Sequence, residues 1–266
     1  MAQVARINVT PVKSLALAHP EEVRVESTGV PGDRLFYLVD EDGRLFSAHD
    51  FGPLQTILPS FNAAGEHLSL TFPDGMVLEG DATRFAEPLV TDFYGRPVRA
   101  HVVPGEWAEA LSRFAGTSLR LARCDVPGDG TDVYHLSLVS RASIAELGTR
   151  GGHQGELDAR RFRMTFDLDG CQAHEEDTWA GRRVRIGNTL LRIYGQVPRC
   201  LVTTQNPETG TKDFESLKVI VSYRPLMQDE DGKGIPFGMY AEVERPGRVR
   251  VGDRVEVLEG HQNPSS

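Results

Sequence analysis

Residues 184–193 read VRIGNTLLRI, two short apolar runs separated by a Gly-Asn pair. In the first run Val184 and Ile186 alternate with charged residues, which is the two-residue period of a strand with one buried face. Gly187-Asn188 supplies a tight turn, and residues 190–193 form the returning strand. This stretch therefore predicts a β-hairpin.

The same pattern recurs along the chain. Further hairpins are predicted for residues 68–78, around Pro73-Asp74-Gly75, and for residues 249–257, around Gly252-Asp253. Residues 23–25 and 35–39 add two more strands. Many short strands joined by closely spaced turns indicate sheets that close into barrels. The fold class is therefore predicted to be mainly β with a few short helices.

Three segments carry helix signals. Residues 107–114 place four apolar side chains on one helical face: Trp107, Ala110, Leu111 and Phe114. Residues 140–148 begin with a serine cap candidate, carry a Ser143/Glu146 capping-box pair and end at Gly148. Residues 215–223 are a third candidate, stopped by Pro225. Beyond these, Trp179 is expected to begin a core strand.

A domain boundary is expected between residues 115 and 130, because residues 125–131 are polar and rich in turn formers. The predicted domains are residues 1–120 and residues 121–266, the second with a core of about 125–258. A chain of 266 residues with 39% hydrophobic content can fill such cores.

The net charge of −9 argues against a nucleic-acid partner and against an anionic membrane surface. The sequence contains no apolar run of the roughly 20 residues that a membrane span needs. Three cysteines are too few, and odd in number, for a disulfide framework: Cys124, Cys171 and Cys200. A reducing compartment, by default the cytoplasm, is therefore expected.

Cys200 is the best candidate for chemistry. It stands in residues 197–210, VPRCLVTTQNPETG, directly after Arg199. A neighbouring positive charge favours the thiolate, which is a nucleophile and a ligand for soft metals. The alternative is that Cys200 is simply a small buried hydrophobe.

Basic residues offer a second signal. Residues 160–163 (RRFR), Lys13 and Arg34 could together form an anion pocket, or each could be a solvated surface charge. Cys171 and His174 have the spacing of a metal-binding pair, but no second pair accompanies them. The favoured interpretation there is a turn followed by solvated acids.

Dispersed motifs in the C-terminal half resemble the MOSC domain, which is named after the C-terminal part of molybdenum-cofactor sulfurase. They are residues 161–163, 176–179, 199–200 with 203–204 and 206–210, 222–224, 237–240 and 246–253. Residues 11–14, 32–34 and 46–48 resemble the β-barrel that precedes MOSC in one subfamily. That subfamily includes the mitochondrial amidoxime-reducing components and their bacterial counterparts. The resemblance implies an N-terminal MOSC-type β-barrel packed on a C-terminal MOSC β-barrel.

The resemblance also implies a molybdenum–molybdopterin cofactor (Moco), with Cys200 as both the metal ligand and the catalytic centre. Seven positions match cofactor-holding residues of the family: Lys13, Ser14, Arg34, Arg163, Thr165, Arg199 and Tyr240. Two positions depart from the family pattern. Thr165 stands where reductases often have asparagine, and Pro198 stands where relatives carry a polar residue, although proline has no N–H to donate.

The implied function is a molybdenum-dependent oxidoreductase that removes oxygen from N-hydroxylated or other N–O small molecules. No cysteine follows Cys200, so an appended ferredoxin domain is not expected. Electrons would come from a separate protein carrying an iron–sulfur cluster (a ferredoxin), flavin or haem.

The alternative function is a non-catalytic carrier of the cofactor, or of sulfur held as a persulfide on Cys200. Pyridoxal phosphate is associated with the family only through the sulfurase's separate N-terminal domain. This chain shows no Schiff-base lysine motif that would hold it.

Overall fold

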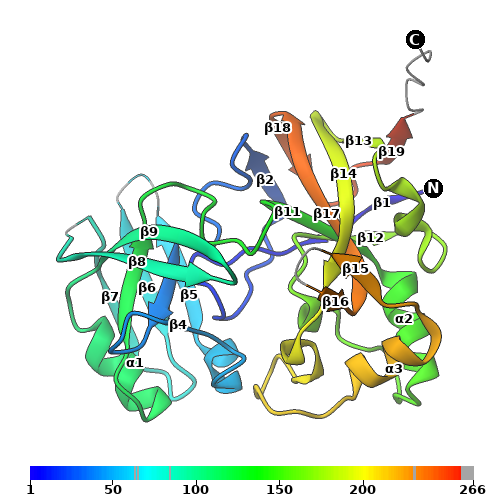
Figure 1. The fold of residues 1–266 in the computed structure, drawn as a ribbon. Coiled ribbons are helices and arrows are strands. Elements are labelled where there is room, and N and C mark those ends of the chain that lie inside the picture. The colour runs from blue at the N-terminus through cyan, green and yellow to red at the C-terminus, as the bar shows by residue number, and fades with distance from the viewer. Residues whose placement is uncertain (63, 65, 84, 230–231, 259–266) are drawn as a thin grey trace.

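Two lobes lie side by side in the computed structural model, which describes residues 1–62, 64, 66–83, 85–229 and 232–258 (Figure 1). The last eight residues of the predicted second domain lie outside these ranges. The strands form a near-closed barrel and a curled half-barrel sheet, with only three α-helices in the described residues. The predicted mainly β fold class is confirmed.

The strands are β1 Gln3–Ile7, β2 Glu22–Val25, β3 Phe36–Val39, β4 Leu45–Phe46, β5 Leu58–Asn62, β6 His67–Thr71, β7 Val77–Asp81, β8 Pro88–Phe93, β9 Arg96–Val102, β10 Arg120–Cys124, β11 Leu136–Ser140, β12 Phe166–Asp169, β13 Arg183–Ile186, β14 Thr189–Pro198, β15 Met227–Asp229, β16 Gly232–Gly234, β17 Pro236–Arg245, β18 Gly247–Arg250 and β19 Val255–Leu258. The helices are α1 Trp107–Ala115, α2 Arg141–Arg150 and α3 Ser216–Tyr223.

The N-terminal lobe, as we call it, contains the sheet β4-β3-β10-β9-β8, the sheet β5-β6-β7 and helix α1. The C-terminal lobe contains the seven-stranded sheet β1-β12-β11-β17-β14-β13-β19, the pair β18-β2, and helices α2 and α3. Strand β1 pairs with β12 and strand β2 with β18, both antiparallel. The first two strands of the chain therefore complete the C-terminal lobe before the chain enters the N-terminal one.

Two of the three predicted hairpins are confirmed. Strands β6 and β7 pair around residues 72–76, and β13 and β14 pair around Gly187-Asn188. The hairpin predicted around Gly252-Asp253 is wrong, because β18 pairs with β2 and β19 pairs with β13. The turn itself forms, but Gly252 N donates to Val4 O at 2.8 Å, so its partner is the N-terminal strand β1.

All three predicted helices are present, although the ends of α2 differ. The side chain of Ser140, and not the Ser143/Glu146 pair, caps α2 by accepting from Ser143 N at 3.3 Å. The helix also continues through Gly148 to Arg150. A Cβ at Gly148 would lie 3.2 Å from the Cβ of Leu157. That glycine therefore allows close packing and does not end the helix.

Two expectations for residues 171–179 are corrected. Trp179 is buried in the core as expected, but it closes the short 3₁₀ helix Glu175–Trp179 and begins no strand. Glu176 is fully buried, although the acids here were expected to be solvated. Its Oε1 accepts from Ser140 N at 3.1 Å and from Ser143 Oγ at 2.7 Å. Burial nevertheless raises the pKa of Glu176.

His174 forms a half-buried polar cluster with Tyr223 of α3 and with Arg224, the residue after that helix. Its Nδ1 lies 2.5 Å from Arg224 Nη1, and its Nε2 lies 3.3 Å from Tyr223 Oη. Because a guanidinium only donates, Nδ1 accepts and the proton of neutral His174 sits on Nε2. Arg224 Nη2 also donates to Asp177 at 2.6 Å. Burial, and then Arg224, lower the pKa of His174.

This lowered pKa predicts a pH dependence of stability. A group with a depressed folded pKa stabilises the fold fully above its unfolded pKa, about 6.5 for histidine, and loses that contribution as the pH falls. We expect the free energy of unfolding to drop more between pH 7.5 and 5.5 in wild type than in His174→Asn. Asparagine tolerates the left-handed φ of 61° at this position. Urea unfolding at both pH values measures the difference, and equal drops would contradict it.

Candidate functional site

The turn that follows Cys200 joins the two lobes. Gln205 Nε2 donates to Ala48 O at 2.8 Å, and Gln205 Oε1 accepts from Gln55 Nε2 at 2.7 Å. Gly210 has a φ of +69° and touches the backbone of Gly52, where a Cβ on Gly210 would lie 2.2 Å from the Gly52 carbonyl carbon. The Asn-Pro-Glu-Thr-Gly turn therefore docks on the N-terminal lobe and holds the preceding residues beside it.

Cys200 itself lies between the end of β14 and a 3₁₀ helix, Leu201–Thr204. Its carbonyl accepts from Thr203 N at 3.2 Å and from Thr203 Oγ1 at 3.0 Å, so the backbone is fixed while the residue is exposed. Cys124 is buried and Cys171 is half-buried, and burial raises the pKa of each of these two thiols to about 12. Cys200 is the most exposed of the three cysteines.

Arg163 connects the lobes in both directions. Its carbonyl accepts from Arg34 Nη2 at 2.9 Å, and its own Nη2 donates to Leu15 O at 2.6 Å. Arg34 also pairs with the carboxylate of Asp33. Burial, and then the charge of Arg34, lower the pKa of Arg163. Two guanidinium groups are thus held close together in a partly desolvated place.

Lys13 adds a third cation to the site and pairs with the carboxylate of Asp132. Its Nζ donates to Gly130 O at 3.1 Å and to Asp132 Oδ1 at 2.5 Å. Asp132 is half exposed, and burial acts to raise its pKa, but Lys13, Arg34 and Arg199 outweigh that effect and the pKa is lowered. Asp132 is therefore ionised at neutral pH. Ser14 follows Lys13 in a left-handed conformation, with a φ of 74°.

Arg199 supplies the fourth cation. Its Nη2 donates to Phe162 O, its Nη1 lies 3.3 Å from Met164 Sδ, and its Nε is buried with no hydrogen-bond partner in the described structure. Burial lowers the pKa of Arg199, and Cys200 and Tyr240 oppose that shift. Tyr240 lies on β17, and burial raises the pKa of its phenol.

These residues influence one another electrostatically. Cys200 acts on Arg163, Arg199 and Tyr240, while Asp132 responds to Lys13, Arg34 and Arg199. We call this set the Cys200 site: Lys13, Ser14, Arg34, Asp132, Arg163, Arg199, Cys200 and Tyr240. Residues predicted from both halves of the sequence meet here.

Thr165 is placed differently from the other predicted residues. It is 1% exposed, and its Oγ1 accepts from Ser137 N at 3.2 Å while Thr165 N donates to Ser137 Oγ. The Thr165 hydroxyl therefore accepts a hydrogen bond from the backbone of β11. Its role toward a cofactor stays a prediction.

The arginine cluster of residues 160–163 does not act as one unit. Arg161 forms an ion pair with Asp213, with N–O distances of 2.6 and 2.9 Å, and Arg160 pairs with Asp158 and Glu208. Only Arg163 of the three reaches the Cys200 site. Conversely, sequence reasoning missed Asp132, which follows directly on the turn-rich boundary segment.

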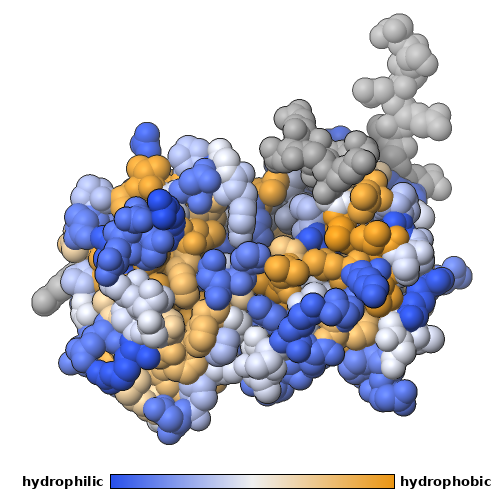
Figure 2. Space-filling model, turned by 60° about the horizontal axis from the view of Figure 1, so that its bottom comes forward, coloured by the Kyte–Doolittle hydropathy of each residue, from blue (hydrophilic) through white to orange (hydrophobic). Residues whose placement is uncertain are grey.

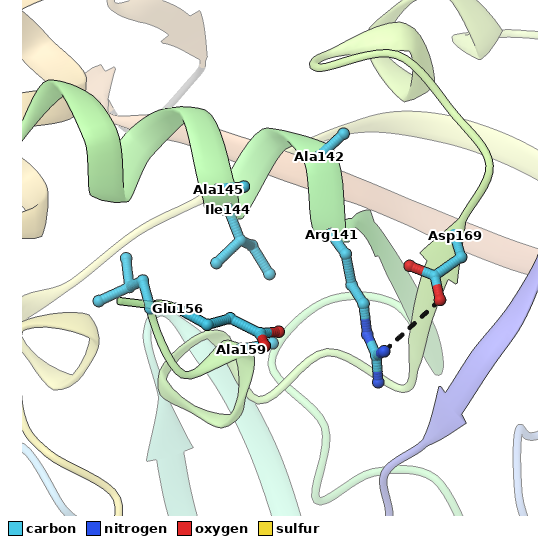
Figure 3. A pocket seen from close by; sticks show the side chains of 8 residues that line it. Arg141, Ala142, Ile144, Ala145, Glu156, Ala159 and Asp169 are labelled. Carbon is cyan, nitrogen blue, oxygen red and sulfur yellow. Dashed lines mark hydrogen bonds and ion pairs between the residues drawn. The ribbon is translucent and has the colours of Figure 1, made fainter. Parts of the chain in front are cut away.

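Two cavities are lined by residues outside the Cys200 site. One is bordered by α2 and contains the Arg141–Asp169 ion pair, at 3.5 Å, beside Ile144 and Glu156 (Figure 3). The other is lined by Phe85, His101 and Cys124. Neither includes a predicted site residue. On the face shown in Figure 2, apolar patches alternate with hydrophilic residues over both lobes.

Within the described ranges, no cluster of three or more His, Cys, Asp or Glu side chains is arranged to hold a metal. No helix in the described part of the chain is long and apolar enough to cross a membrane.

Comparison with known proteins places the chain in a family. Residues 126–256 match the MOSC domain, and residues 1–117 match the MOSC N-terminal beta barrel domain. The chain belongs to the MOSC family, with the N-terminal barrel in front.

Individual relatives are distant. The chain is 38% identical over 128 residues to mitochondrial amidoxime reducing component 2 of Rattus norvegicus, a match that covers 47% of this chain and 37% of the relative. It is 27% identical over 281 residues to mitochondrial amidoxime reducing component 2 of Macaca fascicularis, covering 95% of this chain and 82% of the relative. The crystal structure of the YUAD protein from Bacillus subtilis aligns with a TM-score of 0.44 and 16% identity, over 96% of this chain and 94% of that one.

The glycine contact between the lobes gives a prediction about stability. Gly116 shares the φ of +69° with Gly210 but would meet nothing within 4 Å on gaining a Cβ. Gly116→Ala should therefore cost only the left-handed conformation, about 1 kcal/mol. Gly210→Ala also meets the backbone of Gly52, so we expect a loss of about 2 kcal/mol or more in the free energy of unfolding. Urea unfolding of both variants compares them, and equal losses would show that the contact is dispensable.

Proposed function

We propose that this protein binds the molybdenum–molybdopterin cofactor at the Cys200 site and reduces N-hydroxylated or other N–O compounds by removing oxygen. The observation that carries the proposal is the exposed cysteine among four cations contributed by both lobes: Lys13, Arg34, Arg163 and Arg199. Relatives named amidoxime reducing components support the substrate class.

The residues present fit the cofactor. Cys200 offers a sulfur ligand, and molybdenum is thiophilic. The pterin carries a phosphate, for which guanidinium and ammonium groups are suited partners. A chain with net charge −9 binds an anion only through such a local concentration of cations.

When bound, the cofactor would supply the two-electron chemistry of oxygen removal. The protein's own groups would hold it and orient the substrate. Tyr240 keeps its phenolic proton at neutral pH, because burial raises its pKa, and its Oη can donate a hydrogen bond to a substrate oxygen. The ionised Asp132 can accept a hydrogen bond from a substrate nitrogen.

Reduction of an amidoxime to an amidine and water consumes two electrons and two protons. We propose that a separate donor protein with an iron–sulfur, flavin or haem group delivers the electrons. The donor would act as a partner, and the N–O compound is the small-molecule substrate.

The ligand assignment predicts a change in the sulfur coordination of the metal. Expressed in a host that makes the cofactor, Cys200→Ser should keep both molybdenum and pterin, because the cations that hold the phosphate and the cofactor's own sulfur atoms remain. X-ray absorption at the molybdenum edge should then show one sulfur neighbour fewer than in wild type. Cys171→Ser is the matched control and should keep the wild-type sulfur count. An unchanged sulfur count in Cys200→Ser would disprove the assignment.

The exposed Cys200 residue also favours a second candidate, a carrier that holds sulfur as a persulfide. Intact-mass spectrometry of the purified protein separates the two. A labile adduct of one sulfur atom on Cys200 without molybdenum favours the carrier. Bound molybdenum with turnover of an amidoxime favours the reductase.

A further inference from the structure

Residues 128–132 form a loop before β11, within the polar segment where a domain boundary is predicted. The Gly128 carbonyl accepts from Thr131 N at 3.1 Å and from Thr131 Oγ1 at 2.7 Å. Gly130 is buried, and a Cβ on it would lie 1.8 Å from the Arg34 carbonyl oxygen. This loop, which we call the carbonyl loop, therefore rests directly on the backbone of a residue of the Cys200 site.

Two cationic side chains bind the carbonyl loop. Arg96 Nη2 donates to Asp129 O at 2.7 Å and to Thr131 O at 2.6 Å. Lys13 Nζ donates to Gly130 O, the carbonyl between those two, at 3.1 Å. Because successive carbonyls of the loop bind Arg96 and Lys13 in alternation, the conformation that Arg96 imposes on the loop also determines where the Lys13 ammonium is held.

One aromatic ring lies beside both cations. The Phe93 ring centroid lies 5.3 Å from Lys13 Nζ and 5.8 Å from Arg96 Cζ. Phe93 is 1% exposed and packs edge-on against the Tyr37 ring, with 4.9 Å between centroids, so its ring is fixed in the core. Two like charges beside one ring repel each other, and the ring and the loop carbonyls offset that repulsion. Arg96 is thus coupled to Lys13 both through the carbonyl loop and through Phe93.

Lys13 keeps one donor for a ligand. A lysine ammonium has three N–H donors, and Gly130 O and Asp132 Oδ1 accept two of them in the described structure. The Lys13 side chain is only 11% exposed, so the third donor is offered from a nearly buried position. An anion that reaches Lys13 therefore meets an ammonium whose direction the carbonyl loop has already fixed.

We propose that Arg96 is a positioning residue of the Cys200 site, because it fixes the carbonyl loop that directs Lys13 at an anionic ligand. This inference rests on the function proposed above only for the identity of the anion, which is the phosphate of the pterin cofactor. Arg96 suits the task, since a planar guanidinium binds two carbonyls in a fixed geometry. A donor that is already held in direction loses less freedom when the ligand arrives, and such preorganisation raises affinity.

The first measurement of the experiment needs no cofactor. Reductive methylation followed by peptide mapping gives the labelling rate of Lys13, with the 54% exposed Lys212 as an internal reference. Arg96→Gln removes two charge-assisted hydrogen bonds to the loop. We therefore expect the labelling of Lys13 relative to Lys212 to rise about tenfold. Arg96→Lys keeps a cation that can donate to the same carbonyls, and it should restore most of the protection.

Two further variants control this measurement. Arg99 lies on the same strand β9, and its exposed side chain makes no hydrogen bond or ion pair with any residue of the described ranges. Arg99→Gln is therefore the matched control and should leave the labelling of Lys13 unchanged. Arg96→Met keeps the aliphatic stem of the side chain and should behave as Arg96→Gln does, so the test does not depend on one variant folding.

The second measurement uses the cofactor-loaded protein with acetamidoxime as the substrate. During dialysis Arg96→Gln should release pterin about tenfold faster than wild type, because the direction of the Lys13 donor is no longer fixed. The kcat per bound molybdenum at saturating acetamidoxime should stay at the wild-type value, since Arg96 binds the carbonyl loop and not Cys200. A variant that only disturbed the fold would lower kcat as well.

The outcomes separate this inference from the proposed function. Faster labelling of Lys13 in Arg96→Gln, together with a wild-type protein that holds no pterin, would refute the cofactor proposal and leave the positioning role standing. Wild-type labelling of Lys13, or wild-type pterin release, in Arg96→Gln would overturn the positioning role and leave the reductase standing. An effect of Arg99→Gln as large as that of Arg96→Gln would also overturn it, because the contacts with the carbonyl loop would then not be the cause.

Discussion

The Cys200 site depends on the way Arg163 is held between the lobes. Its carbonyl binds the Arg34 guanidinium, and its own guanidinium binds the carbonyl of Leu15, so one residue of the C-terminal lobe is fixed twice by the other lobe. Bringing two guanidinium groups together away from water is unfavourable, as the lowered pKa of Arg163 shows. The carbonyl acceptors and the docked Gly210 turn offset that cost. The site exists only while the lobes stay joined.

The site carries more positive than negative charge. Four cations face two carboxylates, and the carboxylates differ: Asp33 is 6% exposed and fixed by Thr10 N at 2.7 Å, whereas Asp132 is half exposed. Asp33 therefore holds Arg34 in place, while Asp132 lies where a bound group would meet it. The proposed anionic cofactor would supply the missing negative charge, so the net charge of −9 does not oppose the proposed binding at this place.

Features that are determined by residues close together in the sequence could be predicted from it. Features that are determined by residues far apart along the chain could not. The Gly187-Asn188 hairpin and helix α1 follow from residues within one turn of each other, and both are present. The Gly252-Asp253 turn also forms, but which strands flank it depends on β1 and β2, some 230 residues away along the chain. For the same reason Arg199-Cys200 stood out, whereas Asp132 became visible only once Lys13 lay beside it.

Left-handed backbone conformation at non-glycine residues indicates the site more specifically than residue type does. Six non-glycine residues in the described part of the chain have positive φ: Ser14, Arg34, Glu66, Tyr94, Arg163 and His174. Three of these, Ser14, Arg34 and Arg163, belong to the Cys200 site, although they come from separate segments of both lobes. Each left-handed residue costs stability unless its surroundings hold it there. Arg34 and Arg163 are held there by hydrogen bonds between the lobes, so the joining of the lobes offsets the cost of the two left-handed residues that it brings together.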